Sequence, residues 1–136
     1  MRAAIALSAG LLSATIMTNA AEPPQSARRH DSGWTVPADK AARTNPLAGR
    51  SDVQPGGARL FHERCSVCHG EDARGTSRGP DLTSADVQAQ PDGALFWKIS
   101  SGNTRSGMPT FSFLPQMQRW QLVLHLRAHA HGRGRS

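Results

Sequence analysis

The chain has 136 residues, enough for one domain, and only two cysteines. Its net charge of +6 comes from 16 basic and 10 acidic residues, and the basic residues are almost all arginine. These charges are scattered along the chain, and no aromatic residues alternate with a basic cluster, so we expect no nucleic-acid surface. The charge favours instead a weakly basic docking surface for an acidic protein partner.

The first twenty residues have the pattern of a secretion signal. Arg2 gives a positive start, residues 3–17 are apolar or small, and small residues precede a cleavage position before Ala21. A retained membrane anchor is the alternative, but the apolar run is shorter than the roughly 20 residues that span a bilayer. We therefore predict that residues 1–20 are a signal peptide, that the protein reaches the periplasm, and that no stable membrane span remains.

Residues 21–54 contain several prolines and few large apolar side chains. This composition predicts an extended, partly disordered leader whose removal leaves the rest of the protein intact. Trp34 is the exception, because a lone indole in such a segment can pack onto the neighbouring domain or onto a partner. We place one folded domain at residues 55–131 and a basic flexible tail at residues 132–136.

The folded domain has helical signals and no strand-type alternation. Ser51 or Asp52 can cap a first helix opened by Pro55, which carries Cys65 on its apolar side. Pro91 opens a second helix, and Gly102 is a natural stop for it. The apolar face of this second helix is formed by Leu95, Phe96 and Ile99.

A last helix begins near Pro115 and has apolar residues at helical spacing. These residues are Met117, Trp120, Val123, Leu124 and Leu126. We therefore predict an all-α fold of about three to five helices.

The motif Cys65-Ser66-Val67-Cys68-His69 contains both cysteines. Its spacing is that of covalent haem attachment, in which each thiol adds to one vinyl group and His69 becomes the proximal iron ligand. A thioredoxin-like pair would need a βαβ context, and a zinc site would need further ligands at a similar spacing. A disulfide across two residues would close too small a loop to stabilise much. We therefore expect one haem c, held through Cys65 and Cys68.

Met108 is the candidate for the second axial ligand. Only Met108 and Met117 lie beyond the signal peptide, and Met117 is expected in the core of the last helix. Met108 stands in a loop between Gly107 and Pro109, where a core methionine would gain little. A thioether opposite a histidine favours the ferrous state and raises the reduction potential.

Histidines elsewhere could compete with Met108. His62 precedes the cysteines on the same helix and cannot readily reach the opposite face of the ring. The other candidates, which we expect to be solvated, are His125, His129 and His131.

The order of these motifs resembles the class I cytochrome c family, particularly small bacterial periplasmic members. The segments that carry the resemblance are Gly57-Ala58-Arg59-Leu60-Phe61, Cys65-Ser66-Val67-Cys68-His69-Gly70, Gly79-Pro80-Asp81-Leu82, Gly107-Met108-Pro109 and residues 120–127. The resemblance implies that the carbonyl of Pro80 accepts a hydrogen bond from His69. It also implies that Leu82 packs against the porphyrin.

These observations predict a one-electron carrier rather than an enzyme. A six-coordinate iron leaves no position for a substrate, and no catalytic base stands beside Met108 for peroxidase chemistry. The alternative is a dedicated haem c subunit of a periplasmic dehydrogenase or reductase, docked through the leader and Trp34. The expected partners are redox proteins that donate or accept electrons, and the protein is expected to be a monomer or a subunit of a redox complex.

Overall fold

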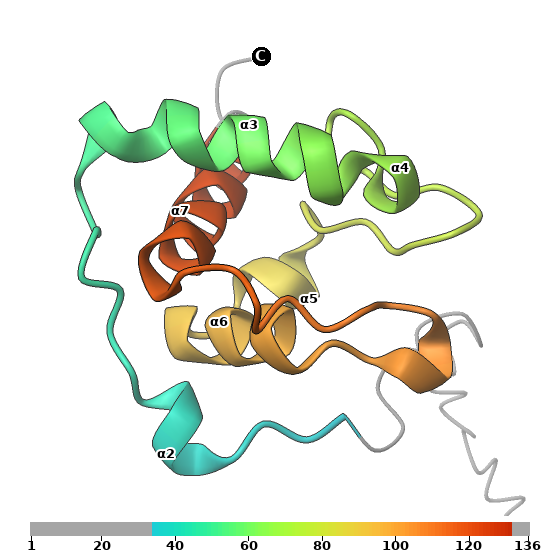
Figure 1. Ribbon diagram of the computed structural model, residues 1–136, viewed down its shortest axis with the longest axis horizontal. Helices are drawn as coiled ribbons and strands as arrows, with labels where there is room; N and C mark the ends of the chain where they lie inside the picture. Colours follow the sequence, from blue (N-terminus) through green and yellow to red (C-terminus); the bar gives the residue numbers. More distant parts are fainter. Residues whose placement is uncertain (1–33, 132–136) are drawn as a thin grey trace, which may run out of the picture.

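The computed structural model describes residues 34–131, so the predicted signal peptide, residues 21–33 and the tail lie outside the described residues. Within this range the chain is helical, and its only β-type pairing is an isolated bridge between Asn103 and Met108 (Figure 1). The elements are α2 (Ala38–Ala41), η1 (Ser51–Val53), α3 (Gln54–Arg64), α4 (Ser66–His69), α5 (Ala85–Gln88), α6 (Asp92–Ser101), η2 (Thr104–Ser106) and α7 (Gln116–His131). The all-α prediction is therefore confirmed.

The described part of the chain has more α-helices than we expected. Three of them, α2, α4 and α5, are single turns of 4 residues each. A single turn is too short to show a hydrophobic period, which explains why the sequence pattern missed these helices. None of the described helices is long and apolar enough to cross a membrane.

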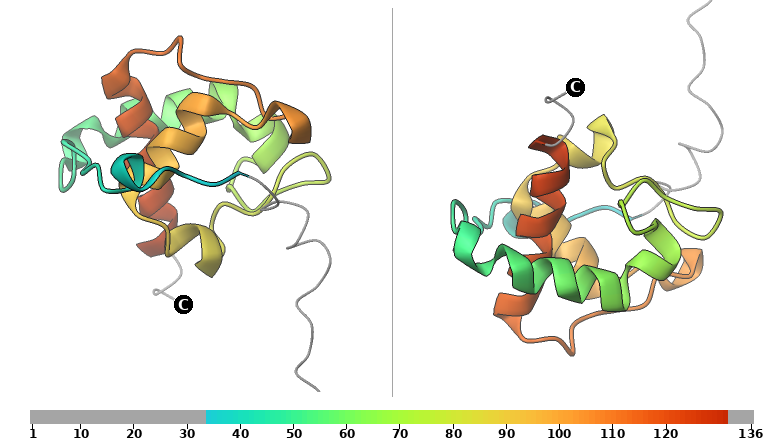
Figure 2. Two further views of the ribbon diagram at one scale, coloured as in Figure 1. Left: turned by 90° about the horizontal axis from the view of Figure 1, so that it is seen from below. Right: turned by 90° about the horizontal axis from the view of Figure 1, so that it is seen from above.

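Helices α3 and α7 cross and form the centre of the fold (Figure 2). Gly57 lies at this crossing, where a Cβ atom would stand 2.1 Å from the carbonyl oxygen of Gln121. One turn later, Phe61 is 2% exposed and packs against α7. The crossing therefore fixes the direction in which α3 runs toward the two cysteines.

Replacing Gly57 with alanine should destabilise the protein by about 3 kcal/mol, because the added methyl group overpacks a contact with rigid main chain. Gly56 provides the matched control, since its Cβ would meet only the flexible end of the Gln121 side chain, at 3.1 Å. Gly56→Ala should change stability by less than about 1 kcal/mol. Urea unfolding of the two variants measures the difference, and equal stabilities would contradict the close crossing.

The rest of the core lies between α6 and α7. Trp120 of α7 is 1% exposed and stacks on Phe96 of α6, with ring centroids 4.0 Å apart. The predicted apolar face of α6 is buried as expected. Met117 is different, because its side chain is 47% exposed, so the prediction that it packs in the core is wrong. Met117 lies in the first turn of α7. The spacing of apolar residues predicts which face of a helix is buried, but it does not show whether other elements pack against that face as far as the first turn.

The predicted ends of the helices are mostly correct, apart from the start of α3. Pro91 is the N-cap of α6, and Gly102 ends that helix. The N-cap of α3 is Val53, which makes no side-chain hydrogen bond, so neither Ser51 nor Asp52 caps this helix. Asp52 instead accepts hydrogen bonds of 2.7 and 2.6 Å from Arg50, and the short helix η1 leads into α3.

Residues 34–50, which we call the strap, run along one side of the molecule and lead into α3 (Figure 1). We expected an extended leader here, but Leu47 is 5% exposed and belongs to the core cluster. The strap main chain lies directly on α6, since a Cβ on Gly93 would stand 2.3 Å from the carbonyl oxygen of Lys40. The buried Leu47 side chain and the close main-chain contact with α6 therefore hold the strap in place despite its polar composition.

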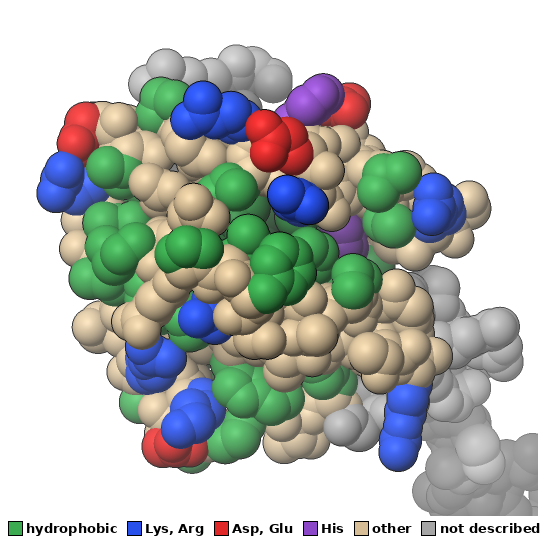
Figure 3. Space-filling model, viewed as in Figure 1, with side chains coloured by type: hydrophobic (Ala, Val, Ile, Leu, Met, Phe, Trp, Pro, Cys, Tyr) green, Lys and Arg blue, Asp and Glu red, His purple; other side chains and the backbone are tan. Residues whose placement is uncertain are grey.

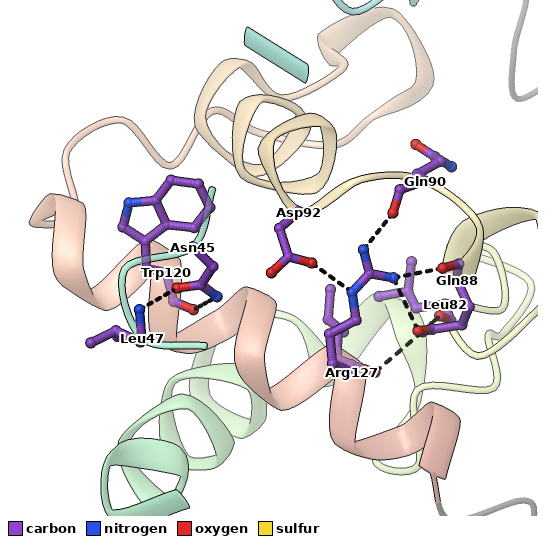
Figure 4. Close-up of polar contacts among 9 residues, drawn as sticks. Asn45, Leu47, Leu82, Gln88, Gln90, Asp92, Trp120 and Arg127 are labelled. Atoms are coloured by element: carbon purple, nitrogen blue, oxygen red, sulfur yellow. Dashed lines mark hydrogen bonds and ion pairs between the residues drawn. The ribbon is translucent and has the colours of Figure 1, made fainter. Parts of the chain in front are cut away.

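Asn45 connects the strap to α7. Its side-chain oxygen accepts a hydrogen bond of 2.9 Å from the backbone N–H of Leu47, and its amide donates to the carbonyl of Trp120 at 3.4 Å (Figure 4). The Asn45 side chain is buried, so these bonds replace its lost contacts with water. The strap is thereby joined to α7, the helix that also carries the buried core residue Trp120.

Candidate functional site

Cys68 and His69 lie on the short helix α4, directly after α3, and Cys65 immediately precedes this helix. Cys65 is the junction between the helices, and the backbone N–H of His69 donates to its carbonyl at 3.0 Å. The hydroxyl of Ser66 donates to the carbonyl of His62 at 2.7 Å, which ties the new turn to the last turn of α3. This arrangement holds Cys65, Cys68 and His69 in one turn of helix.

Both thiols are free and half-buried. Burial raises the pKa of the Cys65 thiol to about 11, and the nearby Cys68 adds a smaller contribution in the same direction. A thioredoxin-like nucleophile requires a lowered thiol pKa, so this environment disfavours that alternative. Among the side chains that the structure describes, no group of three or more His, Cys, Asp or Glu residues could hold a metal ion.

The imidazole of His69 is 8% exposed, and its Nδ1 lies 2.9 Å from the carbonyl oxygen of Pro80. Because a carbonyl can only accept, we assign the proton of this bond to Nδ1. Gly79 leaves no room for a side chain, since a Cβ there would stand 3.1 Å from the imidazole and 2.9 Å from the carbonyl of Cys68. The loop thus fixes both the orientation and the tautomer of His69.

The loop that supplies Pro80 is itself held at Leu82. The backbone N–H of Leu82 donates to the carbonyl of Ala73 at 2.8 Å, and its own carbonyl accepts from the side chain of Gln88 at 2.8 Å. The same Gln88 amide reaches the carbonyl of Leu126 at 3.2 Å. The half-buried side chain of Leu82 packs against the core cluster. Gln88 therefore links this loop to α7.

Arg127 in turn holds the segment around Gln88 (Figure 4). Its guanidinium donates to Asp92 at 2.8 Å and to the carbonyl of Gln88 at 2.7 Å, and it also bonds the carbonyl of Gln90. This half-buried cluster joins α7 to the link between α5 and α6. This cluster could not be predicted from the sequence, because nothing in the spacing of these residues indicates that they meet.

Met108 lies in the connection between α6 and α7. Asn103 and Met108 exchange two backbone hydrogen bonds, of 2.9 and 3.0 Å, and the backbone N–H of Phe111 donates to the carbonyl of Ile99 at 3.2 Å. These bonds give the loop a defined shape, and the half-buried side chain of Met108 packs against the core cluster. Of the two methionines, Met108 is therefore the one directed toward the protein interior.

The remaining histidines have other surroundings. His62 is exposed, and its Nδ1 lies 2.6 Å from a carboxylate oxygen of Glu71. His125 was expected to be solvated, but its ring packs against Phe61 at 5.1 Å, with His129 beside it. Burial lowers the pKa of His125 to about 4, and the neighbouring His129 adds to this shift, so the ring is neutral at physiological pH. The side chain of His131 lies outside the described residues.

The family model described as "Cytochrome C oxidase, cbb3-type, subunit III" matches residues 53–126 of this chain. The chain belongs to this family of c-type cytochrome domains. The match begins at Val53, so the strap precedes the shared region. A crystal structure of cytochrome cL from the marine methylotrophic bacterium Methylophaga aminisulfidivorans is similar, with a TM-score of 0.55 and 25% identity. The similarity covers 65% of this chain and 67% of that one. None of the curated proteins compared with the chain matches it.

Membership of this family implies haem c, and the residues described above are suited to that group. A proximal histidine normally donates its other ring N–H to a carbonyl or carboxylate, as His69 does to Pro80. The two thiols are unpaired by any disulfide and lie in the same turn as the histidine. The sulfur ligand expected from the sequence comes from a loop of defined shape. The donor set and its supports therefore fit the cofactor.

Proposed function

We propose that this protein is a periplasmic, mono-haem c-type cytochrome that carries single electrons, with His69 and Met108 as axial ligands. The observation that carries the proposal is the hydrogen bond between His69 Nδ1 and the Pro80 carbonyl, which directs the other ring nitrogen, Nε2, to the role of iron ligand. Thioether bonds at Cys65 and Cys68 would hold the haem, whose iron supplies reversible one-electron chemistry. The fold supports a c-type cytochrome, and the periplasmic location rests on the signal pattern of residues 1–20.

The surface around the cysteines is suited to brief contacts with redox partners. Val67, between the two cysteines, is 62% exposed, which is unusual for an apolar side chain in the middle of a buried motif. Arg64, next to Cys65 in the chain, is exposed as well, and so are Arg78 and Arg105, which lie in the segments that carry Pro80 and Met108. Figure 3 shows apolar and basic side chains interspersed on one face of the molecule. We infer that the redox partners have acidic docking surfaces, and that neither a nucleic acid nor a membrane span is involved.

The alternative function is a dedicated subunit docked to a larger enzyme through Trp34. In the structure, Trp34 is half-buried, and the ammonium group of Lys98 on α6 lies 4.8 Å from its ring. An indole that packs on its own domain has less surface to offer a partner. This contact favours the freely diffusing carrier over the docked subunit.

Covalent attachment is the first test of the proposal. Haem should remain with the polypeptide through denaturation and acid–acetone extraction, and the mass of the mature chain should rise by one haem. Cys68→Ala should leave at most one thioether and yield unstable holoprotein. Val67→Ala, which changes the exposed residue beside it, should retain full attachment. Haem that is extractable from the wild-type protein would refute the proposal.

A further inference from the structure

His125 and His129 form a pair on the last turns of α7. They stand four positions apart in the chain, which places them on the same face of the helix. Their Nε2 atoms are 3.1 Å apart, and their rings are nearly perpendicular, at 85°. Neither the haem motif nor the core of the fold accounts for two imidazoles in this arrangement.

The surroundings of the pair direct the two Nε2 atoms toward each other. Phe61 packs against both rings, with centroid distances of 5.1 Å to His125 and 6.2 Å to His129. Nδ1 of His125 is buried and has no hydrogen-bond partner, so Nε2 is the nitrogen through which this ring makes its polar contact. Among the described residues, each of these two rings makes its only hydrogen bond with the other.

The separation of the nitrogens suits a shared metal ion. Two imidazole nitrogens that each bind a zinc ion at about 2.0–2.1 Å stand roughly 3.3–3.4 Å apart in tetrahedral geometry. The observed 3.1 Å is slightly shorter than this separation, so small rotations of the rings would let both lone pairs converge on one ion. Arg127, the nearest cationic side chain in the chain, is turned to another face, where it bonds Asp92 and Gln88.

We propose that His125 and His129 form a surface binding site for a late first-row divalent cation, such as Zn²⁺, Ni²⁺ or Cu²⁺. Imidazole ligands select these ions over Mg²⁺ and Ca²⁺, which prefer oxygen. Water would complete the coordination. Binding through Nε2 of His125 leaves a proton on the buried Nδ1 without an acceptor. We therefore expect the affinity to be about 10–100-fold below that of a site whose ligands have such acceptors.

The test uses the secreted holoprotein without a histidine tag. Zn²⁺ is the probe, because it is redox-inactive and cannot oxidise the haem. Isothermal titration should show one ion bound per chain, and the melting temperature should rise with Zn²⁺ concentration. His129→Gln should weaken binding by at least about tenfold. His62→Gln is the matched control, because His62 is exposed, lies on α3 and pairs with Glu71.

Each outcome decides for or against the site. Weakened binding in His129→Gln with unchanged binding in His62→Gln supports it, provided that the haem spectrum shows that both variants are folded. The absence of saturable Zn²⁺ binding in the wild-type protein would overturn the proposal. Equal affinities of the wild-type and His129→Gln proteins would overturn it as well.

Discussion

Replacing Met108 with alanine should remove the weak far-red absorption band of the oxidised protein, which arises from sulfur bound to ferric haem. The same change should lower the reduction potential by about 0.1–0.3 V, within the roughly 0.8 V range that axial ligands set. It should also open one coordination position, so that carbon monoxide binds the ferrous protein. Optical spectroscopy and a redox titration measure all three effects. Asn103→Gly should leave most of these signals in place, because the pairing between residues 103 and 108 is made by the backbone and does not need the asparagine side chain.

Met117→Ala is the matched control for Met108→Ala. Met117 is the other methionine beyond the signal segment, and its side chain is 47% exposed on the first turn of α7. The variant should keep the far-red band, the potential and the resistance to carbon monoxide. If instead Met117→Ala removes the band and Met108→Ala retains it, the proposed ligand assignment is wrong.

The helices that the sequence predicted best are those whose ends and faces are determined locally. Pro91 and Gly102 delimit α6, and its apolar residues repeat at helical spacing, so both its bounds and its buried face could be predicted. The start of α3 was not predictable in the same way. Asp52 is a residue type that often caps helices, but in the structure its carboxylate pairs with Arg50. Whether Asp52 caps the helix or binds Arg50 depends on the conformation of the chain that precedes α3.

The candidate site likewise has one part that local sequence predicts and another part that it does not. The order and spacing of Cys65, Cys68 and His69 follow from covalent chemistry, which requires those residue types within one turn of helix. What the sequence could not show is how that turn is held. Gln88 reaches both the Pro80 loop and α7, and Arg127 fixes the segment that contains Gln88. These contacts join residues far apart in the chain, and neither periodicity nor a local motif indicates such contacts.

The strap shows the limit of an argument from composition. We expected this segment to be extended and to form no core of its own, because it has few apolar residues, but Leu47 and Asn45 attach it to the core of the domain. Leu47 fills a position in the core cluster, and Asn45 bonds the main chain of both the strap and α7. The average composition of a segment does not reveal whether its few apolar residues are buried.

Replacing Leu47 with alanine should therefore destabilise the full-length holoprotein by about 2–5 kcal/mol, because a buried side chain is lost and a cavity remains. Deleting residues 34–50 should cost more, since it also removes the Asn45 hydrogen bonds and uncovers α6. Urea unfolding, followed through the haem absorption, measures both losses. Ala48→Ser is the control, because Ala48 follows Leu47 in the strap but is exposed, and its variant should differ from the wild type by less than about 0.5 kcal/mol.

The same variants separate a stabilising role of the strap from a role in docking. Leu47→Ala leaves Trp34 in the chain, so a strap that only supports the fold should give a less stable protein whose electron transfer at low temperature is unchanged. Trp34→Ala removes the contact with Lys98, and should likewise leave the rate of electron transfer from the physiological donor intact. A steep loss of that rate in Trp34→Ala, with unchanged exchange with a small artificial oxidant, would instead favour the dedicated subunit. Equal stability of Leu47→Ala and Ala48→Ser would show that the strap is not part of the core, because only one of these side chains is buried in the structure.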